Sequence, residues 1–140
     1  MHDRRSDTET YHELCAYTLT HPDPAFIHQY AVDAFAAQSA DHDTKPITLA
    51  FALVGLYLCT ERNYSGRQVQ RVHTLLARRR KHWPSFDLPP HRGDISVHDV
   101  MAAPPGAARD EMIRRWCDSV WGAYSAGRGR VVELLETELA

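Results

Sequence analysis

A histidine and an aspartate, five residues apart, are the polar residues of this sequence best suited to chemistry. His28 and Asp33 fall in a stretch with the apolar spacing of an amphipathic helix, and their separation places them about 140° apart around its axis. Both would therefore border the crevice between this helix and a neighbour. His28 could act there as a ligand or a general base, with Asp33 as its orienting group or as a separate acid. The alternative is a structural histidine, hydrogen-bonded to another helix.

Two more polar side chains belong to the inward stripe of the same segment. Tyr30 and Gln38 share this stripe with Ala31 and Ala34. A buried amide must find hydrogen-bond partners, so Gln38 either orients a ligand or makes a structural hydrogen bond. The candidate ligand-binding residues are His28, Tyr30, Asp33 and Gln38.

A second candidate set consists of histidines on separate predicted helices, His12, His28 and His73. Helical bundles build metal sites from side chains on facing helices. The sequence contains no His-x-x-x-His and no His-Glu-x-x-His, and its Glu-x-x-His at residues 9–12 spans a predicted helix start. A divalent metal is therefore a secondary hypothesis for a cofactor, and no catalytic set is identified.

The cysteines, Cys15, Cys59 and Cys117, are widely spaced and include no Cys-x-x-Cys pair, which argues against a zinc knuckle or a thioredoxin-like motif. Buried, reduced thiols are the expectation, and they suit a cytoplasmic protein.

No apolar stretch occurs in the first ten residues, so no signal peptide is expected. The longest apolar run, residues 47–59, is too short to span a membrane.

A basic run at residues 78–81, followed by His82 and Trp83, raises the possibility of nucleic-acid binding. The formal net charge of -2 and the pI near 6.5 argue against it. Cations at a helix end complement the negative pole of the helix dipole. We therefore interpret the run as a solvated helix end.

The elements that position these residues are all helical. A length of 140 residues fits one domain, and no segment shows the alternation of a strand. We predict an all-α bundle of four to six helices around a central hydrophobic helix at about residues 46–60. Nearly every position there is apolar, which is typical of a helix buried on all sides. Gly55 within it would let a neighbouring helix approach closely.

The other boundaries follow from capping signals and prolines. A Thr-x-x-Glu pattern predicts a first helix from Thr10, and a second is expected at about residues 24–39. A fourth follows residue 66, a short one is capped by Ser96 and Asp99, and a fifth long helix begins near Ala107. Residues 131–139 form a last amphipathic segment. We expect residues 1–8 to be disordered and the Pro-rich residues 82–94 to form an ordered loop.

With these elements in place, the chain resembles a family of short, mainly bacterial proteins known as domain of unknown function 5946. The likeness starts at residues 28–38, which are similar to the family's H-x4-D-A-aromatic-x-x-Q. It continues, in order, through residues 53–58, residues 83–89 with 93–100, and the tryptophan motif at residues 116–124. The resemblance implies a helical fold and no assigned activity. Many family members read W-x-x-W-x-x-H-H at the last motif, whereas this chain has Trp121, Tyr124, Gly127 and Arg128 at the four specified positions.

These observations favour a small-molecule or metal-binding protein with an interhelical pocket on the second helix. One alternative is an interaction module, such as a homodimer that buries part of the fifth long helix. Another is an enzyme that uses His28 as a general base.

Overall fold

The computed structural model describes residues 6–20, 23, 25–79 and 82–139. Within these residues the chain forms helices and no strand, which confirms the predicted all-α fold. There is one helix more than the range we predicted, because the short capped segment and the C-terminal segment are both separate helices. The helices are α1 (Asp7–Thr20), α2 (His28–Ser39), α3 (Pro46–Glu61), α4 (Gly66–Arg79), α5 (Val97–Ala102), α6 (Ala107–Ala123) and α7 (Arg128–Leu139), with a 3-10 turn, η1 (Ser125–Gly127), before α7.

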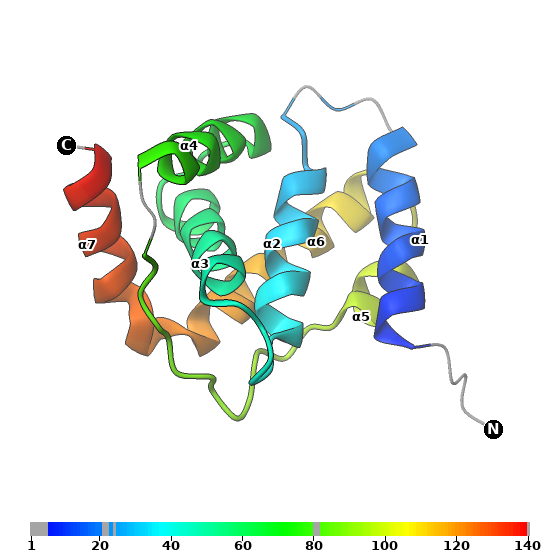
Figure 1. Cartoon of the computed structure of the whole chain (residues 1–140). Helices are drawn as coiled ribbons and strands as arrows, with labels where there is room; N and C mark the ends of the chain where they lie inside the picture. Colours follow the sequence, from blue (N-terminus) through cyan, green and yellow to red (C-terminus); the bar gives the residue numbers. More distant parts are fainter. Residues whose placement is uncertain (1–5, 21–22, 24, 80–81, 140) are drawn as a thin grey trace.

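The central hydrophobic helix is α3. From Leu49 to Leu58 every residue except Phe51 is buried. The helices α2, α4, α6 and α7 all pack against it, while α1 and α5 lie on the far side of α2 and α6 (Figure 1). A helix apolar on all faces is stable in water only when neighbours cover every face. The apolar composition of α3 therefore requires that other helices surround it.

The predicted close approach at Gly55 occurs between α2 and α3. The carboxyl group of Asp33 occupies the space beside Gly55, and a Cβ atom there would lie 1.8 Å from Asp33 Oδ2. Asp33 is itself 3% exposed. The missing side chain at Gly55 therefore makes room for a buried carboxyl group.

The Ser96–Asp99 capping box is confirmed. The Ser96 hydroxyl accepts the backbone N–H of Asp99 at 3.3 Å, and the Asp99 carboxylate accepts that of Ser96 at 2.9 Å. The capping box expected at Thr10 is wrong, because α1 begins at Asp7. The Ser6 hydroxyl accepts the N–H of Glu9 at 3.1 Å, so an earlier Ser-x-x-Glu pattern provides the cap.

The start of α2 lies later than predicted. The Asp23 carboxylate accepts the N–H groups of Ala25 and Ile27, and Phe26 has a left-handed backbone with φ of 60°. A non-glycine residue in this region interrupts a helix, so α2 begins at His28. Pro24, the predicted first residue, lies outside the described residues.

The Pro-rich segment between α4 and α5 runs along the core as a loop. Trp83, Phe86 and Leu88 are partly buried against the core. The Arg92 guanidinium donates to the carbonyl oxygens of Gln38 and Ala40 at the end of α2. The loop is therefore attached to α2 by hydrogen bonds as well as by apolar contacts.

Candidate functional site

His28, the first residue of α2, turns toward α1. Its Nδ1 atom lies 2.9 Å from the hydroxyl of Thr18, and the Phe26 ring meets it edge-on at 5.6 Å between centroids. Burial lowers the pKa of the imidazole below its usual value, because burial disfavours the charged form. His28 is thus a neutral, half-buried group with a partner on α1.

Asp33 turns instead toward α3. Its Oδ1 atom accepts a hydrogen bond of 3.1 Å from the side-chain amide of Gln29. Burial raises the pKa of this carboxyl group well above its usual value, which favours the protonated form. Since His28 contacts α1 and Asp33 contacts α3, the structure does not bring the predicted pair together.

Tyr30 and Gln38 have partners of their own. The Tyr30 hydroxyl donates to the carbonyl oxygen of Tyr64. The Gln38 amide donates to the carbonyl oxygens of Arg92 and Ile95 at 3.2 and 2.7 Å, and its oxygen accepts the indole N–H of Trp116 at 2.9 Å. Gln38 therefore joins α2, the Pro-rich loop and α6.

The histidines of the second candidate set also lie apart. His73 Nε2 is 2.8 Å from the carbonyl oxygen of Phe51, and the two rings stack at 4.8 Å. His12 is exposed on α1 and next to Tyr11. Within the described part of the chain, no three His, Cys, Asp or Glu residues are grouped so that they could hold a metal ion. His12, His28 and His73 accordingly do not form such a group.

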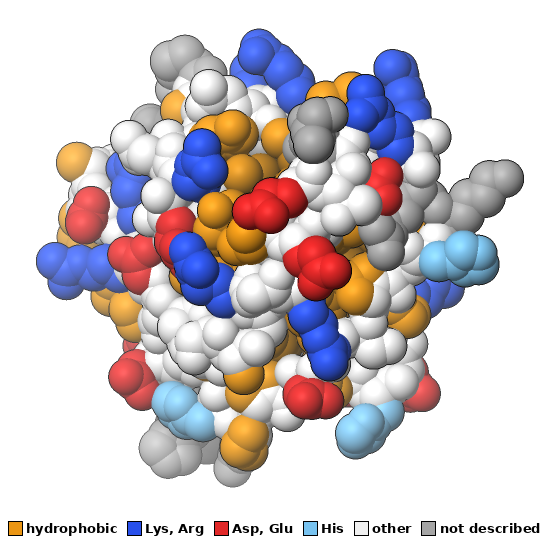
Figure 2. Space-filling view, turned by 90° about the vertical axis from the view of Figure 1, so that its left-hand side faces the viewer, with side chains coloured by type: hydrophobic (Ala, Val, Ile, Leu, Met, Phe, Trp, Pro, Cys, Tyr) orange, Lys and Arg blue, Asp and Glu red, His pale blue; other side chains and the backbone are white. Residues whose placement is uncertain are grey.

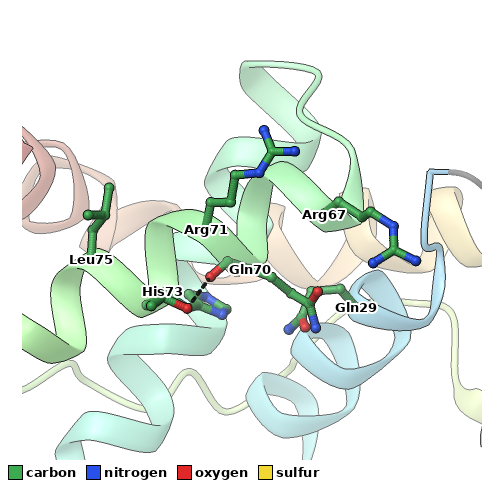
Figure 3. A pocket seen from close by; sticks show the side chains of 7 residues that line it. Gln29, Arg67, Gln70, Arg71, His73 and Leu75 are labelled. Carbon is green, nitrogen blue, oxygen red and sulfur yellow. Dashed lines mark hydrogen bonds between the residues drawn. The ribbon is translucent and has the colours of Figure 1, made fainter.

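A groove of about 820 Å³ lies between α2 and α4. One buried residue of α2 and the outer side of α4 form its walls (Figure 3). In Figure 3 the amide groups of Gln29 and Gln70 point toward each other where the two helices meet. The lining residues are Gln29, Arg67, Gln70, Arg71, His73, Thr74 and Leu75.

The groove is electrostatically positive. Arg67 and Arg71 lie one helical turn apart, and neither the lining nor the rest of α4 contains an Asp or Glu. The Arg67 guanidinium lies over the ring of Phe26, 5.0 Å from its centroid, and this cation–π contact restricts its position. Arg71 makes no ion pair with any residue that the structure describes.

The sequence predicted an interhelical pocket on the second helix but not this lining. Of the candidate residues only His73 lines the groove, and the residue that α2 contributes is Gln29 rather than the predicted His28. Arg67, Gln70 and Arg71 have the pattern of a solvent-exposed helix face. The available signal was the absence of any acidic residue from residues 66–79, since solvated helix faces usually mix both charges.

Residues 7–125 match the model of a family of unknown function, DUF5946. This chain belongs to the DUF5946 family. No curated protein and no solved structure matches it. The matched region includes the whole α2–α4 groove of this DUF5946 protein. Among its described helices, none combines the length and apolarity needed to cross a lipid bilayer.

Proposed function

We propose that this DUF5946 protein binds a small organic anion, a phosphate or carboxylate compound, in the groove between α2 and α4. The observation on which this depends is the pair of guanidinium groups, Arg67 and Arg71, on a groove whose lining contains no carboxylate. Guanidinium groups bind carboxylate and phosphate through paired, charge-assisted hydrogen bonds.

The remaining walls suit the uncharged part of such a ligand. Gln29 and Gln70 offer amide groups, and Leu75, which is 40% exposed, offers an apolar surface. The volume falls within the range of about 300–1,000 Å³ that is usual for small-molecule sites. Because the arginines are exposed to solvent, we expect the affinity to fall as salt concentration rises.

Isothermal titration calorimetry of the full chain tests the proposal. The probes are inorganic phosphate, a set of phosphate monoesters and a set of dicarboxylates, all at constant ionic strength. We expect at least one probe to bind, and Arg71→Gln to weaken its binding about tenfold, the effect of losing roughly 1.4 kcal/mol. Inorganic phosphate separates recognition of the charged group alone from recognition of an attached organic part.

The matched control is Arg78→Gln. Arg78 is an exposed arginine on the same helix and lies outside the groove lining, so this variant should bind as the wild type does. Absence of heat with all three probe classes would contradict the proposal. An equal loss of affinity in both variants would also contradict it, because it would indicate attraction to the overall charge of α4.

We also infer that the protein acts in the cytoplasm, an inference supported by its free cysteines.

Homodimerisation through α6 stays a hypothesis, and light scattering at high protein concentration tests it. Trp116 and Val120 are fully buried within one chain, so a dimer would have to use the partly buried Met112 side of that helix. We do not expect nucleic-acid binding; basic and acidic side chains are interspersed on the face shown in Figure 2.

A further inference from the structure

Two cysteines that are distant in sequence meet at a second cavity, between α3 and α6. Cys59 and Cys117 both line this cavity of about 200 Å³. The two thiols are near enough to interact electrostatically, while each donates its hydrogen to a backbone carbonyl oxygen, Cys59 to Leu56 and Cys117 to Tyr30. The other lining residues are Tyr30, Thr60, Asn63, Arg114 and Asp118. This cavity shares no lining residue with the α2–α4 groove.

The two thiols differ in access. Cys117 is 1% exposed, and its sulfur lies 3.5 Å from the carbonyl oxygen of Tyr30, to which the thiol donates. Cys59 is partly exposed. A small molecule from solvent therefore has access to Cys59, whereas Cys117 is shielded.

We propose that Cys59 and Cys117 form a redox-active pair that a peroxide converts reversibly into a disulfide linking α3 to α6. The inference does not depend on the proposed anion groove. It rests on the cavity that both cysteines line and on the partial exposure of Cys59.

The chemistry balances with peroxide as the oxidant. The Cys59 thiolate attacks one peroxide oxygen; the O–O bond breaks, an S–O bond forms, and the departing hydroxide takes up a proton. The Cys117 sulfur then attacks the Cys59 sulfur; the S–O bond breaks, the S–S bond forms, and the hydroxyl leaves as water with the Cys117 proton. The two thiols lose two electrons and two hydrogens in total, and hydrogen peroxide is reduced to two waters.

Access favours Cys59 as the attacking group, because it is the partly exposed thiol of the pair and Cys117 is buried. The neighbouring Cys59 thiol and burial together raise the pKa of Cys117 well above its usual value. Cys117 thus stays protonated until it resolves the oxidised Cys59.

The experiment exposes the full chain to hydrogen peroxide, blocks free thiols with an alkylating agent, and measures intact mass and peptide masses. We expect the loss of two hydrogens, a linked peptide pair containing Cys59 and Cys117, and full reversal by dithiothreitol. The third cysteine provides the matched control: Cys15→Ser should form the same disulfide at the same rate.

Two variants divide the roles. Cys59→Ser, at the partly exposed position, should abolish the disulfide and leave Cys117 unmodified. Cys117→Ser should leave Cys59 as a sulfenic acid that dimedone traps. If this buried variant does not fold, the result with Cys59→Ser alone tests the proposal. The proposal is overturned if both thiols stay free while Cys15 is oxidised. A disulfide that includes Cys15 or joins two chains would overturn it too.

Discussion

At the scale of single residues, the contact between Gly55 and Asp33 determines how closely α2 and α3 pack. We predict that Gly55→Ala destabilises the protein by about 1–3 kcal/mol, the usual cost of overpacking a core. The added methyl group would overlap the Asp33 carboxyl group, since its Cβ would lie 1.8 Å from Oδ2. Denaturant unfolding followed by circular dichroism measures the change.

A double-mutant cycle with Asp33→Ala provides the control for this prediction. Removing the carboxyl group vacates the space that the methyl group needs, so Gly55→Ala should cost less in the Asp33→Ala background. An equal cost in both backgrounds would show that the clash is with other atoms.

His73 should make stability depend on pH on the acidic side. Burial lowers the pKa of His73 from its ordinary 6.5, although the hydrogen bond with the Phe51 carbonyl opposes this shift. The folded state thus binds the proton more weakly than the unfolded state, and stability should fall as the pH drops from about 6.5 through the folded pKa. We predict that His73→Gln, which keeps an N–H donor for that carbonyl, flattens this fall.

Thermal unfolding between pH 7.5 and 5 measures the effect. Some pH dependence should remain in His73→Gln, because burial also lowers the pKa of His28. The exposed His12 supplies the control, and His12→Gln should leave the profile unchanged. If the pH dependence of stability were the same in His73→Gln as in the wild type, the assignment of that dependence to His73 would be contradicted.

At the scale of secondary-structure elements, the short helix α5 depends on its cap and in turn holds α1. Its His98 imidazole lies 3.0 Å from the hydroxyl of Thr10 and 2.7 Å from the carboxylate of Asp7. One six-residue helix forms too few hydrogen bonds to be stable alone. The cap and the contacts with α1 and α6 therefore supply its stability.

We predict that Ser96→Ala lowers the free energy of unfolding by about 1 kcal/mol, the typical cost of losing an N-cap side chain. Amide hydrogen exchange should accelerate in α5 and at the start of α1, because both lose a partner when α5 opens. Ser125→Ala, at an exposed serine outside any helix cap, is the matched control. Faster exchange confined to α5 would show that α1 is held by other contacts.

At the scale of the whole molecule, one hydrophobic core connects the two ends of the protein. The helices α1 and α7 lie at opposite ends (Figure 1). The α7 end is attached through Glu61, whose carboxylate accepts the Trp121 indole N–H at 2.7 Å and the Arg128 guanidinium at 2.7 and 2.9 Å. One core runs through all of these elements.

We predict that the chain unfolds in a single cooperative transition, as small domains with one core do. Far-ultraviolet circular dichroism should follow the helices, and fluorescence should follow Trp83, Trp116 and Trp121. Trp83 reports on the Pro-rich loop, since its ring packs edge-on against Phe51 at 5.0 Å. Midpoints that differ between the two probes would instead indicate separate units, and Trp83→Phe would show whether the loop is the separate one.

The sequence by itself determined the helical class, the central position of α3 and the capping box of α5. Each depends on spacing within one segment, and the residues concerned are neighbours along the chain. The same local reasoning predicted room beside Gly55 but did not identify Asp33 as the group that fills it. It also chose Thr10 as the first cap although Ser6 begins the same pattern, because a capping motif does not state which of two copies a helix uses.

Only the tertiary structure decided which polar groups meet. His28 contacts Thr18 of α1 and Gln38 contacts Trp116 of α6, while the groove formed from side chains that a helical pattern assigns to solvent. Cys59 and Cys117 likewise meet across α3 and α6. The physical reason is that helical periodicity determines which face of a segment is buried, whereas the partner of each side chain depends on the angle and height at which another helix crosses that face.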